Sequence, residues 1–441
     1  MTSVVVGLGR TGASCLRFLA KHGIAVSATD TRTAPPGLTE LGGLARTLDI
    51  RLGGFDLSLL DGASQVLMSP GVSLEEPIAT QARARGIEVL GDIELFARAV
   101  RAPVIGITGT NGKSTVTSLV ASMAAAAGRR VLAGGNLGVP ALDLLEQPVP
   151  DLYVLELSSF QLETTSSLAL KAAVVLNVTA DHMDRYASIE DYARAKSRIF
   201  ANAKTLVLNA DDPLVAAMRR DGARVVTFST QRSDVDFSLL ESGKSTVLAR
   251  RGEPLLDTSR MKISGLHNAA NALAALALGE AAGLELPAML AALESFPGLK
   301  HRSAWIADIA GVRFVDDSKG TNVGATIAAV SGLRGPLVVI AGGEGKGQDF
   351  APLAAAFDGK VRHVVLIGKD APAVAAALKD VCTIERTATL EAAVSAAAAA
   401  ARPGETVLLS PACSSLDMFR DYAHRGEVFT RAVRALEGAP A

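Results

Sequence analysis

The sequence is poor in cysteine, in aromatic residues and in net charge. Its 441 residues include three cysteines, Cys15, Cys382 and Cys413, which lie far apart and form no C-x-x-C pair. A disulfide framework or a structural zinc site is therefore not expected, and a reducing compartment fits. A formal net charge of −1 supplies no basic field for nucleic acid or an anionic membrane. Any anionic ligand must be met by a local site.

Long apolar runs are missing as well. No stretch approaches the roughly 20 apolar residues that a membrane-spanning helix needs. The first seven residues, MTSVVVG, lack a basic segment, so we expect a β-strand there and not a signal peptide. These absences predict a cytoplasmic protein without membrane insertion, and the lack of an amphipathic seam makes a monomer the default.

Short apolar segments alternate with helical segments along most of the chain, which is typical of parallel α/β domains. Glycine-rich turns follow two of the apolar segments, Val4–Val6 and Val104–Thr108, and the alternation restarts after Gly298. We therefore predict an α/β protein of three domains. Rossmann-like domains over residues 1–92 and 299–441 flank a central P-loop domain with a parallel sheet over residues 93–298. The alanine run 396–401 is expected to be an exposed helix, because alanine is the best helix former.

The sharpest motif lies between a predicted strand and a predicted helix. It consists of Gly109, Thr110, Asn111, Gly112, Lys113, Ser114 and Thr115. Glycines let such a loop turn its N–H groups toward a phosphate, and the helix N-terminus adds partial positive charge. Lys113 would reach the β- and γ-phosphates of a nucleotide, and the Ser114 hydroxyl would bind magnesium. The fit to the general pattern is imperfect, because Ile107 occupies the position of the first glycine.

Acidic and polar side chains follow two further predicted strands. Glu156 ends the segment YVLE, where α/β folds place ligands and where a carboxylate can hold Mg²⁺. The segment 177–186, NVTADHMDRY, places His182 between two aspartates just after a strand. Lys196 lies on a predicted helix that begins near Ile189 and, taken alone, indicates a solvated lysine.

The N-terminal pattern Gly7-x-Gly9-x-x-Gly12, with Asp30 eighteen residues later, is by itself a dinucleotide-binding fingerprint. Backbone N–H groups facing a diphosphate would serve NAD or a UDP-sugar equally well. The two interpretations differ only in the ligand.

Taken together, these motifs resemble the Mur ligases. The resemblance includes the loop at 109–115, Glu156, the segment 177–186 and Lys196. It continues through the segments 267–271 (HNAAN), 298–302 (GLKHR), 316–322 (DDSKGTN), 342–347 (GGEGKG) and 410–417 (SPACSSLD). The family also uses the shorter phosphate loop, which accounts for Ile107. The segments 316–322 and 410–426 and the short N-terminal domain are similar to the members that add D-glutamate. No Asp-Asn-Pro-Arg motif of the diaminopimelate-adding members is present.

The resemblance implies an ATP-dependent ligase of peptidoglycan precursor synthesis. Such an enzyme joins D-glutamate to UDP-N-acetylmuramoyl-L-alanine through an acyl phosphate. It also implies ATP as co-substrate and two Mg²⁺ ions, one with Ser114 and Glu156, the other supported by His182 and by Lys196 as a CO₂-derived carbamate. Lys113, Glu156, His182, Lys196 and Lys319 would be the catalytic residues.

The remaining roles are likewise implied by the resemblance. The loop 109–115 would bind ATP together with Asn268, Asn271, Arg302 and Asp317. The UDP-substrate would contact Arg10, Thr11, Asp30, Thr31, Arg32, Gly71, Asn136 and His182. D-Glutamate would contact Lys319, Thr321, Lys346, Ser415, Leu416 and Tyr422. In the D-glutamate-adding members we associate a phenylalanine with the position that Tyr422 occupies here. The role of His301 stays open, since a hinge residue is the alternative.

Three alternatives stay open at this point. The chain could be another ligase of the same family, such as one that adds L-alanine or a folylpolyglutamate synthetase. It could bind a nicotinamide through the N-terminal glycines, which would leave Lys113, Glu156 and His182 without purpose. It could also be a nucleotide-binding module without catalytic activity. The choice of D- over L-glutamate follows from the resemblance alone.

Overall fold

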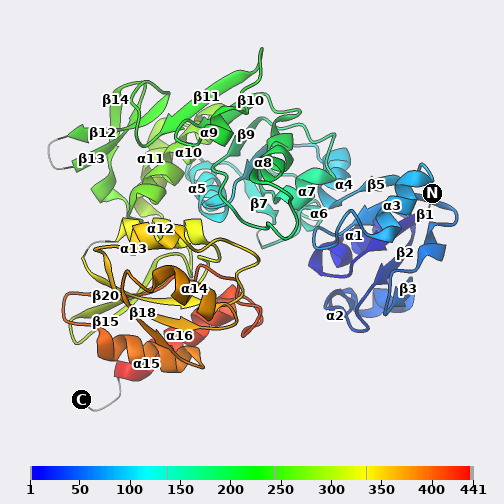
Figure 1. Ribbon diagram of the computed structural model, residues 1–441. Coiled ribbons are helices and arrows are strands. Elements are labelled where there is room, and N and C mark those ends of the chain that lie inside the picture. The colour runs from blue at the N-terminus through cyan, green and yellow to red at the C-terminus, as the bar shows by residue number, and fades with distance from the viewer. Residues whose placement is uncertain (1, 137, 243–244, 334, 438–441) are drawn as a thin grey trace.

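The chain forms three sheets, each with its own helices, in a computed structural model that describes residues 2–136, 138–242, 245–333 and 335–437. One hydrophobic cluster continues from the N-terminal unit into the central one. In Figure 1 the N-terminal unit (blue) and the C-terminal unit (yellow to red) both lie beside the central unit and stay apart from each other. The predicted three-part α/β architecture is confirmed. No helix in the described ranges is both long and apolar enough to cross a membrane.

The N-terminal unit is a five-stranded parallel sheet in the order β3-β2-β1-β4-β5. Its strands are β1 (Thr2–Val6), β2 (Ala25–Asp30), β3 (Asp49–Leu52), β4 (Ala63–Met68) and β5 (Glu88–Leu90). Its helices are α1 (Arg10–Lys21), α2 (Gly37–Leu41), α3 (Pro77–Ala84) and α4 (Asp92–Ala99), with the short 3₁₀ segments Gly42–Arg46 and Leu57–Leu60. This order is that of a Rossmann sheet without its sixth strand, in which ligands bind at the switch point where the carboxyl ends of β1 and β4 diverge.

The central unit has a nine-stranded sheet in the order β14-β13-β12-β11-β10-β9-β6-β8-β7. Its strands are β6 (Val104–Thr108), β7 (Val131–Gly135), β8 (Leu152–Glu156), β9 (Ala172–Val175), β10 (Thr205–Asn209), β11 (Arg224–Ser229), β12 (Phe237–Ser242), β13 (Ser245–Arg250) and β14 (Glu253–Asp257). Its helices are α5 (Lys113–Ala126), α6 (Ala141–Leu144), α7 (Ser159–Glu163), α8 (Ile189–Ser197), α9 (Pro213–Ala216), α10 (Leu266–Ala282) and α11 (Leu286–Ser295), with 3₁₀ turns at Arg198–Phe200 and Thr258–Arg260. Strand β6 is buried along its whole length, as expected for a parallel strand covered on both faces.

The C-terminal unit is a six-stranded sheet in the order β15-β16-β20-β17-β18-β19. Its strands are β15 (Ala304–Ile309), β16 (Val312–Asp316), β17 (Leu337–Gly342), β18 (Val361–Ile367), β19 (Thr383–Arg386) and β20 (Thr406–Leu409). Its helices are α12 (Val323–Gly332), α13 (Pro352–Phe357), α14 (Ala371–Leu378), α15 (Leu390–Ala400) and α16 (Tyr422–Glu437). The carboxyl ends of β16, β17 and β20 lie together because these strands are neighbours and parallel.

Two features differ from the sequence-based expectation. The sheets are not parallel throughout, since β13 and β14 add an antiparallel extension and β15 an antiparallel edge. The alanine run 396–401 does lie mostly on helix α15, but Ala397 is fully buried, so the helix is not simply exposed. Its inner face packs against Val365 and Val407 of the sheet core. Tertiary packing decides which face of such a helix is buried. A run of identical alanines has no hydrophobic periodicity from which that face could be predicted.

Candidate active site

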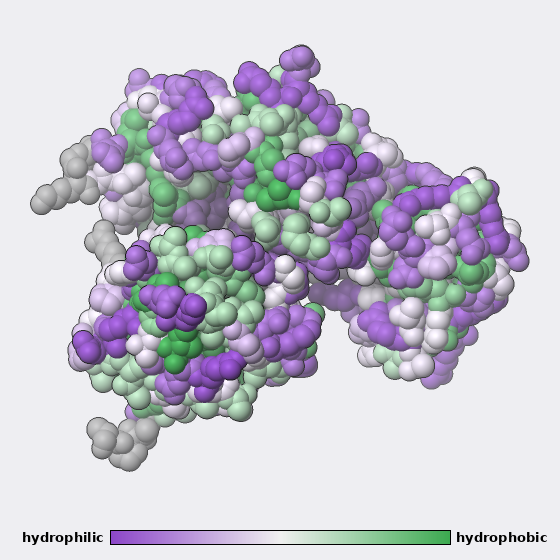
Figure 2. Space-filling model, viewed as in Figure 1, coloured by the Kyte–Doolittle hydropathy of each residue, from purple (hydrophilic) through white to green (hydrophobic). Residues whose placement is uncertain are grey.

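Three cavities lie in series along the three units. The N-terminal cavity, of about 550 Å³, opens between β1, β4 and the end of β7. The central cavity, of about 290 Å³, lies between the phosphate loop and the C-terminal unit. The distal cavity, also about 290 Å³, lies between the phosphate loop, α10 and α12. Asn136 lines the first two cavities, and Arg302 and Lys319 line the last two, so neighbouring cavities share walls. Figure 2 shows the recess between the two outer units, below the central one.

The predicted phosphate loop connects β6 to α5, as the motif required. Asn177, just past β9, holds it: Thr110 N donates to Asn177 O at 2.9 Å, and Asn111 N donates to Asn177 Oδ1 at 2.8 Å. Gly112 has φ = 86°, and a Cβ there would come within 2.4 Å of Asn271 Oδ1. Only glycine fits both constraints. No side chain caps α5, so its first N–H groups remain available to an anion.

Two lysines converge on this loop. Lys113 Nζ donates to Gly109 O and Thr110 O, each at 2.9 Å. Lys196 Nζ donates to the same Gly109 O at 2.9 Å and lies 4.1 Å from the centre of the Tyr192 ring. Lys196 is only 1% exposed, so the interpretation of a solvated lysine is wrong. Burial, reinforced by the charge of Lys113, lowers the pKa of Lys196 well below its usual range.

Glu156 ends β8 beneath the phosphate loop. Its Oε1 accepts a hydrogen bond from Asn136 Nδ2 at 2.7 Å, while its Oε2 is buried and has no partner among the described residues. A buried carboxylate oxygen without a donor costs free energy unless a cation or a donor from a ligand satisfies it. This oxygen is therefore a candidate metal ligand. In the described part of the chain no three His, Cys, Asp or Glu side chains are grouped to hold a metal.

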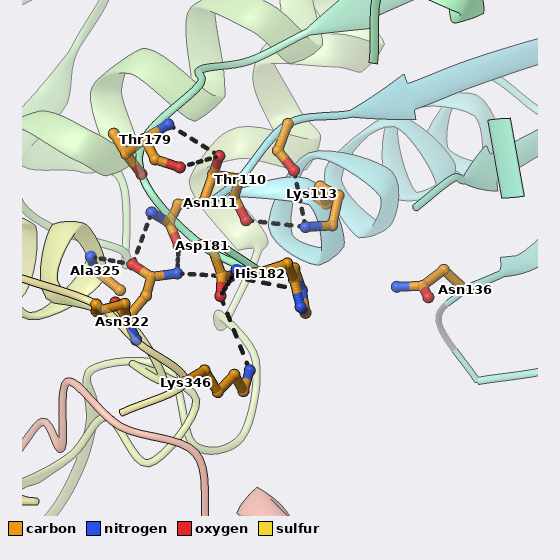
Figure 3. A network of polar contacts seen from close by, with 12 residues as sticks. Thr110, Asn111, Lys113, Asn136, Thr179, Asp181, His182, Asn322, Ala325 and Lys346 are labelled. Atoms are coloured by element: carbon orange, nitrogen blue, oxygen red, sulfur yellow. Dashed lines mark hydrogen bonds and ion pairs between the residues drawn. The ribbon is translucent and has the colours of Figure 1, made fainter. Parts of the chain in front are cut away.

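The segment after β9 places an acid and an imidazole on the central cavity. Asp181 Oδ2 accepts from Asn322 Nδ2 at 3.2 Å, and Asp181 Oδ1 lies 3.8 Å from Lys346 Nζ. His182 adopts a positive φ of 57° and packs edge-on against Phe160. Burial lowers the pKa of His182, an effect that Asp181 partly opposes, so the imidazole is neutral and suited to a metal or an acceptor role. Figure 3 shows this group beside the phosphate loop.

The C-terminal unit contributes cations to the same space. Arg302 Nη2 donates to Ser114 Oγ at 2.7 Å, across the boundary between the two units. Lys319 Nζ lies 3.6 Å from the centre of the Tyr422 ring. Burial, together with the charge of Arg302, lowers the pKa of Lys319 to about 7. Burial raises the pKa of Asp317 to about 7, although Ser410 Oγ donates to its Oδ2 at 2.8 Å.

Most of the predicted residues line one of the three cavities, while their roles stay predictions. The central cavity is lined by Lys113, Ser114, Asn136, Glu156, His182, Arg302, Lys319, Thr321, Lys346, Ser415, Leu416 and Tyr422. The distal cavity is lined by Asn268, Asn271, Arg302, Asp317 and Thr115. The N-terminal cavity is lined by Arg10, Thr11, Asp30, Thr31, Arg32, Gly71 and Asn136. Lys196 lies behind the loop and lines none of these three cavities.

The N-terminal cavity bears on the NAD alternative. Asp30 would have to accept hydrogen bonds from a ribose in a dinucleotide site. Its Oδ2 already accepts from Leu8 N at 2.6 Å and from Arg32 Nη2 at 2.7 Å. Its Oδ1 accepts from the N and Nε of Arg32 at 2.8 and 2.9 Å. Both oxygens are therefore fully used within the protein, which disfavours the nicotinamide interpretation.

Some site residues escaped the sequence analysis. Asn322 and Asp181 stand in segments that the analysis singled out, yet no role was assigned to either. Arg425 is completely buried, and its guanidinium donates to Ser318 Oγ, Ser318 O and Cys413 O. An arginine that faces backbone carbonyls has no signature in the sequence. His301 is held by Asp316 (Nδ1 to Oδ2, 2.6 Å) and its O accepts from Lys319 N, so it supports the loop that carries Lys319.

Fold and site together define a class: a three-part α/β protein whose phosphate loop faces a cleft shared with a cationic C-terminal unit. Comparison with known proteins gives the family. Residues 1–91 match the Mur ligase MurD-like N-terminal domain, residues 107–279 the Mur ligase middle domain, and residues 301–413 the Mur ligase glutamate ligase domain. The chain belongs to the Mur ligase family.

Curated relatives match over nearly the full length. The UDP-N-acetylmuramoylalanine--D-glutamate ligase of Nitrosococcus oceani is 53% identical over 438 residues, covering 99% of this chain and 97% of the relative. That of Methylobacillus flagellatus is 52% identical over 439 residues, covering 98% and 97%. Among solved structures, a pseudomurein peptide ligase type C from Methanothermus fervidus has a TM-score of 0.63 at 20% identity and covers 99% of both chains. UDP-N-acetylmuramate-alanine ligase from Thermotoga maritima has a TM-score of 0.63 at 19% identity, covering 99% of this chain and 100% of that one. These structures support the fold.

Proposed function

We propose that the protein is an ATP-dependent ligase that joins D-glutamate to UDP-N-acetylmuramoyl-L-alanine in peptidoglycan precursor synthesis. The observation that carries the proposal is the series of cavities. The N-terminal cavity, which would hold the diphosphate, leads past Asn136 to a central cavity rich in cations, and from there past Arg302 to the distal cavity beside the phosphate loop. A UDP-linked acid entering from one end and ATP from the other would meet in the middle. The names of the full-length relatives support the substrate assignment.

The reaction brings two anions together. A carboxylate oxygen of the substrate attacks the γ-phosphorus of ATP, ADP leaves, and an acyl phosphate forms. The amino group then attacks the acyl carbon, the bond to the phosphate oxygen breaks, and the amine loses its proton. Positioning and positive charge dominate such phosphoryl transfer. Lys113 and Arg302, which meet at the phosphate loop, would neutralise the γ-phosphate.

The two proposed Mg²⁺ ions fit the donors present. Ser114 and the unpaired Glu156 Oε2 would hold one ion, and His182 the other. When bound, the ions would supply positive charge that screens the phosphates from the attacking carboxylate. The carbamate on Lys196 is likewise a proposal. It is supported by the lowered pKa of this lysine, because only the neutral amine can add CO₂ and release a proton.

The incoming amino acid would lie between cations of the C-terminal unit. Lys319 and Lys346 line the central cavity with the hydroxyls of Thr321 and Ser415. Two ammonium groups suit a dicarboxylic amino acid better than a neutral one. Leu416, which is 65% exposed, would be covered on binding. Domain boundaries near residues 92 and 298, a monomeric state and the location in the cell stay predictions.

A coupled phosphate-release assay tests the proposal. Purified protein would be given ATP, Mg²⁺, UDP-N-acetylmuramoyl-L-alanine and a panel of D- and L-amino acids. We expect phosphate release that depends on D-glutamate and a product larger by one glutamate in mass spectrometry. Turnover with L-alanine, or ADP formation without amide product, would refute it.

A further inference from the structure

Asn322 has no assigned role, yet it is the side chain through which the C-terminal unit contacts the phosphate loop most fully. It lies between β16 and α12 and is 3% exposed. Its Oδ1 accepts from Ala325 N at 2.8 Å, which caps the N-terminus of α12. The cap fixes which amide atom is the oxygen, so the Nδ2 group must face the opposite way, toward the central unit.

The Nδ2 group of Asn322 donates to two acceptors of the central unit. One is Asn111 Oδ1 in the phosphate loop and the other is Asp181 Oδ2, each at 3.2 Å. Asn111 Nδ2 returns a hydrogen bond to Asn322 Oδ1 at 3.3 Å, so the two amides form a reciprocal pair. Figure 3 shows Asn322 between Asn111 and Asp181, with Lys346 on the far side of Asp181.

This single amide therefore connects groups with different tasks in the proposed reaction. Asn111 belongs to the loop that would hold ATP, whereas Asp181 lies 3.8 Å from Lys346, which would hold the amino acid. The main chain around Asn322 is itself anchored, because Val323 N donates to Gln348 Oε1 at 2.9 Å and Gln348 belongs to the segment that follows Lys346. Movement of α12 relative to the phosphate loop would break the pair and displace Lys346.

We infer that Asn322 is a positioning residue, which through its amide holds the phosphate loop and the Lys346 segment in register for transfer to the amino acid. The catalytic consequence of this inference rests on the proposed function, whereas the contact between Asn322 and the phosphate loop does not. Asn111 and Asn322 both line the central cavity, and neither lines the N-terminal cavity. The effect should therefore fall mainly on ATP and the amino acid, and leave the contacts of the UDP end of the other substrate unchanged.

The decisive variant is Asn322→Asp, since aspartate caps a helix as well as asparagine but has no Nδ2 donor. It also places a second carboxylate beside Asp181, so the variant keeps the helix cap and loses both hydrogen bonds that Asn322 Nδ2 donates to the central unit. We expect kcat/KM for the amino acid to fall about 10- to 100-fold, as for a lost hydrogen bond to a charged group. The KM for the UDP-substrate should stay within about twofold. The cap of α12 is kept, so the variant should still unfold cooperatively, at a melting temperature lowered by the added carboxylate.

Two further variants complete the design. Thr389→Ala removes a cap from α15 of the same unit, far from the site, where Thr389 Oγ1 accepts from Ala392 N at 3.2 Å. It controls for a lost cap, and its kinetics should match the wild type. Combining Asn111→Ala with Asn322→Ala forms a double-mutant cycle, in which we expect the double variant to be little worse than the poorer single variant.

Hydrogen exchange of the ligand-free protein separates this inference from the proposed function. We expect faster exchange in residues 109–113 of Asn322→Asp than in the wild type or Thr389→Ala. Wild-type kinetics together with unchanged exchange in Asn322→Asp would overturn the inference. A wild-type protein that forms no amide would instead refute the proposed function. The exchange result would still show whether Asn322 holds the phosphate loop.

Discussion

At the scale of single residues, burial decides what an ionisable side chain can do. Lys196, Lys319 and Asp317 have ordinary neighbours in the sequence, and nothing local marks them as perturbed. Burial removes water from each of them and favours its neutral form, so the lysine pKa values fall and the aspartate pKa rises. Lys319 and Asp317 both line the distal cavity, and groups shifted in this way within one cleft are expected at a catalytic site.

Lys196→Ala tests the proposed carbamate. Removal of the side chain removes the anion that would form there, and we expect activity to drop about 10²- to 10³-fold, as when one preorganised electrostatic contact is lost. Bicarbonate or a short carboxylic acid should restore part of the activity by filling the vacated space with a carboxylate. The exposed Lys204 serves as the control, since Lys204→Ala should show neither the loss nor the rescue. Absence of rescue at any concentration would argue against the carbamate.

The pH dependence should report Lys319. Burial lowers the pKa of Lys319 to about 7, so its ammonium group is present below pH 7 and is lost above it. We expect kcat/KM for D-glutamate, which reflects the free enzyme, to fall roughly tenfold per pH unit above about pH 7. Lys319→Arg keeps its charge over this range, so its profile should lack that decline. An identical decline in the variant would assign the titration to another group.

At the scale of elements, glycines set how closely a strand and a helix can approach. The turn from β1 to α1 brings Gly12 against the carbonyl oxygen of Gly7, where a Cβ would lie only 2.0 Å away. Ser69 Oγ donates to the same oxygen at 2.6 Å and ties the turn to the end of β4. The N-terminal cavity therefore depends on a backbone approach that only glycine permits.

Gly12→Ala should push the turn apart. We expect a loss of about 1–3 kcal/mol in unfolding free energy from overpacking, measured by denaturant titration. The KM for the UDP-substrate should rise several-fold while ATP affinity stays unchanged, because the distal cavity lies in other units. Gly43→Ala is the matched control, since its Cβ would meet open space. An equal loss in both variants would show that the close approach is not responsible.

At the scale of the whole molecule, the site belongs to no single unit. Arg302 reaches Ser114, and Asn322 reaches Asn111, both across the boundary between the central and C-terminal units. Ligands that bind between the units would favour a closed arrangement. The site is thus completed by domain arrangement as well as by local structure.

Closure can be measured by solution scattering. We expect the radius of gyration to fall when ATP and UDP-N-acetylmuramoyl-L-alanine are added together, because each ligand, bound as proposed, would contact two units. An unchanged scattering profile at saturating ligand would contradict this expectation. Arg302→Ala, which loses the link to Ser114, should compact less than the wild type.

The sequence by itself determined the three-part α/β fold, the phosphate loop between β6 and α5, and the candidate residues at the ends of β8 and β9. It could do so because strand–loop–helix signals and glycine patterns are local, and a chain of ordered motifs identifies a family. Only the tertiary structure decided that Lys196 is buried against Gly109, that Asp30 is already fully bonded, that Asn322 contacts the phosphate loop, and that Arg425 is buried against Ser318. Those properties depend on which distant segments exclude water and supply hydrogen-bond partners. The burial of an individual side chain therefore cannot be read directly from the sequence.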